Sequence, residues 1–365
     1  MNKVRAAIIG LGRIASILEE DSRREKPCTH AGAIDANPDC LLVGGCDIDA
    51  ERRSLFAERW GTPVYADAAE MIRTQKPEIL VIATHPDSHY HYCRLAASLS
   101  VPVLICEKPL ADTLGAARKI AALSKSSGSP IILTNHERRY SADYNKAKEI
   151  LDSGKLGELL SVRAVLYMGQ NKRLLDVFWH DGTHLADVIM FLTGSILKHR
   201  RRWGAKLTAT TGTAWLEGEL ISNFITQRHK GTKEYGVSTN KSLNFVPPCL
   251  CVNKKEKIDI AVPVLMEVGA GRDHLVFETE FSCAKGRVRI GNGIFEVWAS
   301  DESPYAENFR SLKKTCETFS GPTGYFANMI TDAVACARQS GRRPVSSAKD
   351  GLAVIEYLHS VKAWR

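Results

Sequence analysis

The sequence predicts an α/β protein of two domains, an N-terminal doubly wound parallel sheet and a C-terminal α+β domain with a large, mostly antiparallel open sheet. A chain of 365 residues is too long for one ordinary hydrophobic core. In the first third, short apolar runs alternate with amphipathic stretches, and longer strand-like runs dominate after about residue 136. We therefore expect the domains at residues 1–135 and 136–365.

The first domain is expected to contain buried parallel strands, because its apolar runs are short, continuous and bounded by turn residues. The runs are Val4–Ile9, Leu41–Cys46, Ile79–Ala83, Val103–Cys106 and Ile131–Thr134. Between them, amphipathic stretches predict helices at Ala50–Trp60, His89–Leu99 and Thr113–Ser127. Doubly wound sheets bind ligands at the carboxyl ends of their strands, so the residues after each run are candidates for a site.

The second domain is expected to open with a helix at Tyr144–Ser153 and to close with helices at Tyr325–Ser340 and Ala348–Ala363. Strands are expected at Leu160–Met168, Lys206–Glu217, Glu219–Gln227, His274–Cys283, Gly286–Ile290 and Gly293–Ala299. The polar stretch 228–273 shows no pattern that places an element.

Composition excludes several classes of protein. Hydrophobic residues make up 44% and charged residues 25% of the chain, as in globular proteins. No apolar run approaches the roughly 20 residues that span a bilayer, and the N-terminus resembles a strand instead of a signal peptide, so we expect a cytoplasmic protein without membrane contact. The ten cysteines are scattered without a C-x-x-C pair, which argues against zinc and disulfides.

The net charge of +8 is moderate. Its densest cluster is 198–202 (Lys-His-Arg-Arg-Arg), which could contact phosphates or lie in a solvated loop or strand edge, and we favour the second reading. An anionic substrate is a weak alternative. Aromatic residues are not interleaved with the basic ones, so no nucleic acid partner is expected.

A glycine-rich loop follows the first strand. Its sequence, Gly10-Leu11-Gly12-Arg13-Ile14-Ala15, opens a helical pattern. Gly10 permits a tight turn, Gly12 lets a pyrophosphate approach the backbone, and Ala15 lets helix and strand pack closely. Placed between a strand and a helix, this loop predicts a Rossmann dinucleotide-binding domain.

Asp47 ends the second strand, where a carboxylate can accept hydrogen bonds from ribose hydroxyls and would repel a 2′-phosphate. The expected cofactor is therefore NAD, and Arg52 and Arg53 keep NADP possible. Asp49 is better placed than Asp47 to cap the next helix. The distance along the chain from Gly12 to Asp47 exceeds the common value of about 20 residues. The excess lies at Glu19–Pro27, which could be a flap over the cofactor or a solvated loop, and we slightly favour the loop.

Further polar segments follow the later strands. They are Thr84-His85 with His89, Glu107-Lys108-Pro109, the Asn135–Arg139 segment, and His180-Asp181 with His184 and Asp187. Together with the glycine loop, these motifs resemble the family of glucose–fructose oxidoreductase and myo-inositol dehydrogenase. The E-K-P tripeptide at a strand end is the most specific of them. The resemblance covers essentially the whole chain, although the middle of the second domain matches only by pattern.

The resemblance implies a role for each residue. Lys108 would stand beside the nicotinamide, polarise the substrate oxygen and relay its proton, and His184 would be the second acid or base. Glu107 would orient the nicotinamide end, and Arg139 would hold substrate hydroxyls. The implied cofactor-binding residues are Gly10, Gly12, Arg13, Ile14, Asp47, Thr84, His85, His89, Glu107, Lys108 and Asn135. The implied substrate-binding residues are Lys108, Arg139, His180, Asp181 and His184.

One position departs from the family, which usually carries an Asp four residues before the histidine. Here His180 occupies that position and Asp181 is shifted by one. Either Asp181 reaches the site because the helix starts differently, or His180 takes the role of the family's Asp. Both residues are therefore catalytic candidates together with Lys108 and His184. His180 and His184 also have a metal-ligand spacing, but no third ligand is evident and no metal is expected.

These features predict an enzyme that transfers a hydride between NAD(P) and a secondary alcohol or ketone of a sugar, sugar derivative or cyclitol. One alternative is a non-catalytic dinucleotide sensor, which would be expected to lose the lysine or the histidine. Another is an NAD-using glycoside-modifying enzyme, whose first step needs the same residues. The resemblance further implies a homodimer or homotetramer assembled through the large sheet.

Overall fold

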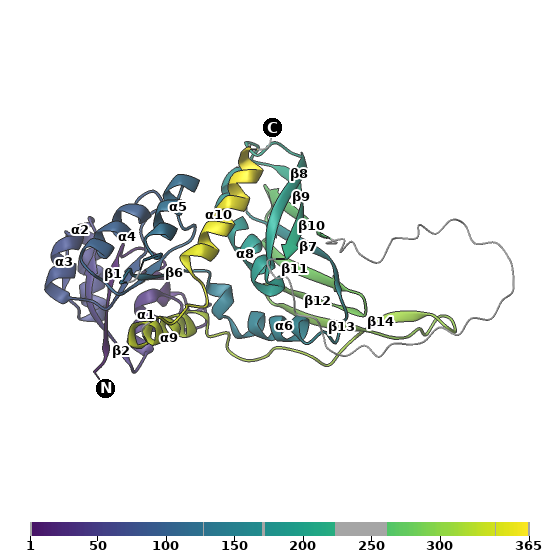
Figure 1. The fold of residues 1–365 in the computed structure, drawn as a ribbon, viewed down its shortest axis with the longest axis horizontal. Coiled ribbons are helices and arrows are strands. Elements are labelled where there is room, and N and C mark those ends of the chain that lie inside the picture. Colours follow the sequence, from purple (N-terminus) through teal and green to yellow (C-terminus); the bar gives the residue numbers. More distant parts are fainter. Residues whose placement is uncertain (1, 127, 170–171, 223–260, 340, 364–365) are drawn as a thin grey trace.

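Two sheets lie side by side in the computed structural model, which describes residues 2–126, 128–169, 172–222, 261–339 and 341–363 (Figure 1). The first sheet is entirely parallel and has the strand order β3-β2-β1-β4-β5-β6, which is the doubly wound order predicted. Its strands are β1 (Val4–Ile9), β2 (Cys40–Cys46), β3 (Val64–Tyr65), β4 (Ile79–Ile82), β5 (Val103–Cys106) and β6 (Ile131–Thr134). All the predicted strands are confirmed to within one residue, and only the two-residue β3 was not expected.

The helices of this half are α1 (His30–Ala36), α2 (Ala50–Trp60), α3 (Ala68–Gln75), α4 (His89–Ser98) and α5 (Leu114–Ala122). Asp49 caps α2, since its side chain accepts hydrogen bonds from the backbone N–H groups of Glu51 and Arg52. The helix expected directly after the glycine loop needs correction. Turns and a short 3₁₀ helix, η1 (Ile17–Glu20), follow Gly12 instead, and α1 begins only at His30, where Thr29 caps it.

The second sheet has the order β14-β13-β12-β11-β7-β10-β9-β8 and is antiparallel except for the β7–β10 pair. Its strands are β7 (Leu159–Tyr167), β8 (Ser195–Gly204), β9 (Gly212–Ser222), β10 (Val262–Ala270), β11 (Val276–Cys283), β12 (Gly286–Gly291), β13 (Ile294–Glu302) and β14 (Arg310–Lys314). Its helical segments are η2 (Glu137–Tyr140), α6 (Ala142–Asp152), α7 (Leu174–His180), α8 (Gly182–Thr193), α9 (Tyr325–Arg338) and α10 (Ala348–Ala363).

The two strands predicted at Lys206–Glu217 and Glu219–Gln227 were wrong in position. Strands β8 and β9 form an antiparallel hairpin, and β9 runs through Gly218, the residue that separates the two predicted strands. A Cβ at Gly218 would lie 2.6 Å from the Lys198 carbonyl oxygen, so the glycine permits close strand approach instead of ending the strand. The basic cluster 198–202 lies on β8 at the edge of the sheet, as favoured. Residues 223–227 lie outside the described ranges.

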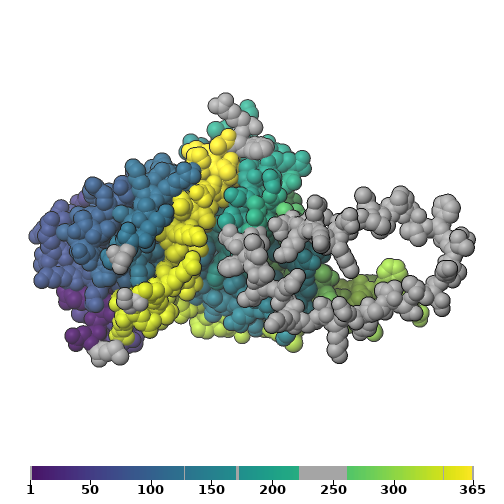
Figure 2. All heavy atoms as spheres, in the orientation of Figure 1, coloured from purple at the N-terminus to yellow at the C-terminus, as the bar shows by residue number. Residues whose placement is uncertain are grey.

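The end of the chain returns to the first sheet. Helix α9 packs against α1, β4 and β5, and its Phe326, Met329 and Ile330 share an apolar core with Ile8. Helix α10 contacts α5 on one side and α8 and β8 on the other. It forms the yellow band between the two halves in Figure 2. We keep the division into domains at residues 135 and 136 as a proposal, with α9 and α10 joining the halves.

Candidate active site

A cavity of about 570 Å³ lies at the carboxyl ends of β1, β2 and β4. This is the edge at which doubly wound sheets bind nucleotides. The lining residues are Ile9, Gly10, Gly12, Arg13, Ile14, Cys46, Asp47, Ile48, Arg52, Ala83, Thr84, His85, Asp87, Ser88 and Tyr92. Seven of the residues predicted to bind cofactor therefore line one cavity, namely Gly10, Gly12, Arg13, Ile14, Asp47, Thr84 and His85.

The structure requires glycine at the two loop positions for different reasons. Gly10 has a positive φ of 87°, and a Cβ there would lie 2.7 Å from the Ala83 carbonyl oxygen. At Gly12 the nearest atom to an added Cβ would be Arg52 Nη1 at 3.9 Å, so the backbone faces open space. Gly10 is thus required by the fold, whereas Gly12 leaves room beside the backbone for a ligand.

Asp47 is buried in the wall of this cavity, with 7% of its surface exposed. Its two carboxylate oxygens accept hydrogen bonds from Leu11 N at 2.8 Å and Asp49 N at 3.0 Å. Arg52 Nη1 lies 3.7 Å from the same carboxylate, and Arg52 also lines the cavity. Arg53 instead donates to the Asp47 carbonyl oxygen, and of the two arginines only Arg52 lines the cavity.

His89 is placed behind the cavity wall. Its ring is fully buried, with Nε2 3.0 Å from the Thr84 carbonyl oxygen and Nδ1 3.2 Å from that of Leu110. Burial lowers its pKa, although the hydrogen bonds to both carbonyls act in the opposite direction. His89 therefore shapes the Thr84 loop, which faces the cavity, and does not itself line it.

Glu107 is the centre of a buried polar cluster at the end of β5. Its Oε1 lies 2.7 Å from His30 Nε2 and accepts a hydrogen bond of 2.6 Å from Asn135 Nδ2, while Oε2 accepts one from Lys108 N. Burial alone would raise the pKa of Glu107, but His30, Asn135 and Lys108 outweigh it and lower that pKa. The carboxylate holds the backbone from which Lys108 projects. His30 was not selected as a site residue from the sequence.

Lys108 connects the two halves of the molecule. Its Nζ donates a 3.0 Å hydrogen bond to the carbonyl oxygen of His180, the last residue of α7. The backbone of Lys108 follows β5, next to the strand whose end lines the dinucleotide cavity. The ammonium group thus lies at the end of α7, and Lys108 is not among the residues that line the dinucleotide cavity.

A second cavity, of about 470 Å³, lies beside the start of α8, since Asp181 and His184 line it. The residues that line it are Arg24, Glu137, Arg138, Ser141, Asp143, Tyr144, Leu166, Met168, Asp181, His184, Leu275, Phe277, Gly291, Asn292, Gly293, Thr323 and Tyr325. A volume of this size suits a small organic molecule with several polar groups.

His184 is buried in the wall of the second cavity. Burial lowers its pKa well below the ordinary histidine value, and the positive charges of Lys108 and Arg138 act in the same direction. The imidazole is therefore neutral at pH 7 and able to accept a proton. It meets the ring of Phe277 edge-on, with ring centroids 6.3 Å apart.

His180 and Asp181 are separated by a break in the helix. Helix α7 ends at His180 and α8 begins at Gly182, with Asp181 as the residue between them. Asp181 lines the second cavity with His184, whereas the His180 side chain does not, and only its carbonyl contacts Lys108. The expected i, i+4 pair of His180 and His184 is not on one continuous helix. Among the described residues no group of three His, Cys, Asp or Glu side chains could hold a metal ion.

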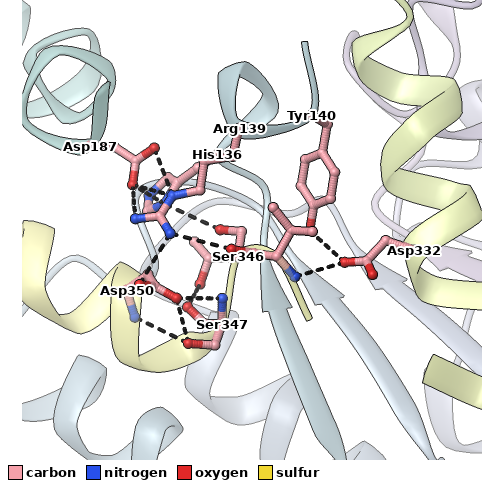
Figure 3. Close-up of polar contacts among 10 residues, drawn as sticks. His136, Arg139, Tyr140, Asp187, Asp332, Ser346, Ser347 and Asp350 are labelled. Carbon is pink, nitrogen blue, oxygen red and sulfur yellow. Dashed lines mark hydrogen bonds and ion pairs between the residues drawn. The ribbon is translucent and has the colours of Figure 1, made fainter. Parts of the chain in front are cut away.

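Arg139 is occupied inside the protein instead of lining the cavity. Its guanidinium binds Asp187 at 2.8 Å and Asp350 at 3.1 Å, and Asp187 also lies 2.8 Å from His136 Nδ1. Figure 3 shows this network between α8, η2 and the start of α10. The charges of Arg139 and His136 outweigh burial and lower the pKa of Asp187 to about 2. Arg138 is the arginine of this segment that lines the cavity.

Arg24 and Arg138 are cavity residues that sequence reasoning did not select. Arg138 differs by one position from the predicted Arg139, and no periodic signal distinguishes the two within a 3₁₀ helix. Arg24 lies within the Glu19–Pro27 segment, whose excess length was the available signal. That segment reaches the second cavity and does not line the dinucleotide cavity.

The comparisons with known proteins agree with the geometry of the first half. Residues 4–135 match the profile of a family described as "Oxidoreductase family, NAD-binding Rossmann fold". The inositol 2-dehydrogenase of Rubrobacter xylanophilus is 35% identical over 120 residues, which are 33% of this chain and 34% of that protein.

Solved structures resemble the whole chain in fold. A putative NADPH-dependent oxidoreductase from Desulfitobacterium hafniense matches with a TM-score of 0.73 and 16% identity, over 100% of this chain and 96% of that one. The myo-inositol 2-dehydrogenase of Lactobacillus plantarum matches with a TM-score of 0.66 and 19% identity, over 99% and 96% of the two chains. These likenesses show that both sheets share the fold of those two proteins. In the described ranges, no helix is both long and apolar enough to cross a membrane.

Proposed function

We propose that this protein is an NAD(P)-dependent oxidoreductase that transfers a hydride between nicotinamide and a secondary alcohol or ketone of a sugar, sugar derivative or cyclitol. The observation that carries the proposal is the position of Lys108. Its backbone follows β5, next to the strand whose end lines the dinucleotide cavity, and its Nζ donates to the carbonyl oxygen of His180, which precedes Asp181 of the second cavity. A sensor that only bound a dinucleotide would need no lysine that joins the end of β5 to the helix break beside the second cavity.

The dinucleotide cavity fits a cofactor of this type. Gly12 leaves open space beside the backbone, and Asp47 presents a carboxylate to the ribose position. Because the Asp47 carboxylate repels a 2′-phosphate, we propose NAD as the preferred cofactor, with Arg52 as the residue that would accommodate NADP. The bound nicotinamide supplies the hydride acceptor or donor for the reaction.

Lys108 and residues of the second cavity perform the proton chemistry in this proposal. The Lys108 ammonium donates a hydrogen bond to the reacting oxygen of the substrate and stabilises the charge that develops on it. His184, neutral at pH 7, accepts the hydroxyl proton when an alcohol is oxidised and returns it when a ketone is reduced. Asp181, and not the His180 side chain, supplies the acidic group beside His184. Assembly into a homodimer or homotetramer stays a prediction.

Lys108→Met tests the proposal, since it keeps the length of the side chain and removes the ammonium. We expect turnover of inositols or aldoses to fall by about 10²–10⁴-fold while NADH binding, measured by fluorescence, is retained. Lys125→Met at an exposed lysine is the matched control. Full activity in Lys108→Met would contradict the mechanism.

Two other results would replace the proposed function. NADH binding without hydride transfer to any sugar or polyol would indicate a dinucleotide sensor. Cleavage of a glycosidic bond without net formation of NADH would indicate a glycoside-modifying enzyme.

A further inference from the structure

The Glu19–Pro27 segment, called the insertion below, is fixed to the body of the protein at two points. Near its start, Glu19 Oε2 accepts hydrogen bonds from Thr29 Oγ1 at 2.6 Å and from Cys28 N at 3.1 Å. Near its tip, the Glu25 carboxylate accepts hydrogen bonds from Thr323 N, Thr323 Oγ1 and Gly324 N at 2.7–2.9 Å. Partial burial would raise the pKa of Glu25, but these three bonds outweigh it and lower that pKa. The insertion is therefore a built wall and not a loose loop.

This double attachment places Arg24 in the second cavity. Arg24 precedes Glu25, and Glu25 binds Thr323, which lines the same cavity as Arg24, Asp181 and His184. Arg24 is thus a residue of the first half of the chain that reaches the cavity of the second half. Its side chain is 43% exposed, and its Nε lies 3.3 Å from Asp21 Oδ2. The structure shows no partner for its terminal nitrogens among the described residues.

Glu137, Arg138 and Asp143 of the cavity wall are already paired, whereas Asp181 Oδ2 makes no hydrogen bond with any described residue. Glu137 Oε1 lies 3.2 Å from Arg138 Nη1, and the Arg138 guanidinium stacks on the Phe277 ring at 4.0 Å. Asp143 accepts hydrogen bonds from the Ser141 hydroxyl and from Tyr144 N, and Asp181 lies 3.8 Å from Lys172. Of the two arginines that line the cavity, Arg24 therefore has its terminal nitrogens available, whereas Arg138 already donates to Glu137.

The charges that act on His184 agree with this pattern of pairing. After burial, the charges that lower the pKa of His184 are the positive charges of Lys108, Arg138 and His136. The acidic side chains of the cavity wall do not reverse that effect. A negative group on a molecule in the cavity would meet the positive charges near His184 and a guanidinium whose terminal nitrogens are unused.

We infer that Arg24 binds an anionic group of the substrate, so that the substrate class is an acidic sugar derivative. The planar guanidinium can donate two parallel hydrogen bonds to a carboxylate or a phosphate. The cavity volume of about 470 Å³ accommodates a hexose-sized molecule. This inference rests on the proposed function, because it names the molecule that would react beside Lys108 and His184.

The test compares glucuronate, glucose 6-phosphate and glucose as probes of the NADH-bound protein, with binding measured by calorimetry and turnover measured separately. In the unchanged protein, we expect one of the two acids to bind more tightly than glucose, and its carboxylate or phosphate identifies the source of the charge. Arg24→Ala is expected to reduce that preference by about ten- to hundredfold, which is the usual worth of hydrogen bonds to a charged group. Arg24→Lys should lose part of it, because lysine keeps the charge but not the planar fork.

Arg23→Ala is the matched control, since Arg23 is an exposed neighbour in the same insertion and does not line the cavity. Equal effects of the Arg23 and Arg24 variants, or no preference for either acid, would overturn the inference. Binding of an acid that depends on Arg24 without any turnover supports the inference and contradicts the proposed function. Turnover of neutral sugars without binding of either acid would support the proposed function and contradict the inference.

Discussion

The two cavities of this protein are built in different ways. All the residues that line the dinucleotide cavity lie between Ile9 and Tyr92, at three strand ends of one sheet. The residues of the second cavity come from positions between Arg24 and Tyr325, and they include the insertion, η2, α8, β7, β11 and the segment before α9. The first cavity is therefore a product of local strand–loop geometry, whereas the second exists only when distant segments have packed together.

The Asp187 network joins η2 to α8, and both elements contribute residues to the second cavity. We expect the loss of this network to have the largest effect on stability. Asp187→Asn removes the charge that faces Arg139 and His136, and leaves Arg139 buried with Asp350 as its remaining acidic partner. Breaking a buried pair in this way costs about 3–5 kcal/mol of unfolding free energy. Denaturant unfolding measures the loss, and Asp152→Asn at an exposed pair with Lys148 is the control, expected to cost below about 1 kcal/mol.

The pH dependence of the same network has a defined sign. The pKa of Asp187 is lowered to about 2 in the folded protein, from an unfolded value of about 3.9. Its contribution is therefore full above about pH 4 and is lost as the pH falls through about 2. Equal losses of unfolding free energy in Asp187→Asn and Asp152→Asn would show that the network does not support the second cavity.

Gly10→Ala tests the local geometry of the first cavity and is expected to have the next largest effect. Alanine at a φ of 87° is strained, and its Cβ would meet the Ala83 carbonyl oxygen at 2.7 Å. Gly61→Ala is the matched control, because Gly61 also has a positive φ but nothing lies within 4 Å of an added Cβ. We expect Gly61→Ala to cost about 1–2 kcal/mol in thermal unfolding and Gly10→Ala to cost more and to weaken NADH binding as well. Equal costs, with NADH binding unchanged, would mean that the loop has room to move.

The protonation of His184 gives the smallest effect. Its pKa is lowered in the folded protein, so below about pH 6.5 the unfolded chain binds more protons than the folded one. The contribution of neutral His184 to stability is therefore complete above about pH 6.5 and declines as the pH falls toward the pKa of His184 in the folded protein. His184→Gln should flatten this decline in unfolding measurements between pH 7 and 5, whereas His274→Gln at an exposed histidine should leave it. An unchanged slope in His184→Gln would assign the decline to another group.

The predictions from sequence succeeded where a short-range pattern carries the information. Buried parallel strands are recognised as short apolar runs, and the glycine loop between a strand and a turn located the dinucleotide cavity. The hairpin of β8 and β9 was misplaced, because Gly218 resembles a break in the sequence but serves a close contact across the strands. Arg139 and Arg138 are neighbours in the chain, and only the packing of η2 against α8 determines which of them points into the network.

The sequence by itself determined the doubly wound sheet, the position of the dinucleotide cavity and the group of candidate residues around Lys108 and His184. The sheet and the cavity follow from periodicity, glycine conformation and strand ends, which are properties of neighbouring residues, whereas the family resemblance selected the candidates around Lys108 and His184. Only the tertiary structure decided that Asp181 and not the His180 side chain lines the second cavity, and that Arg24 of the insertion lines it too. Both depend on contacts between segments far apart in the chain, such as Glu25 with Thr323, and no local pattern encodes which distant partner a side chain meets.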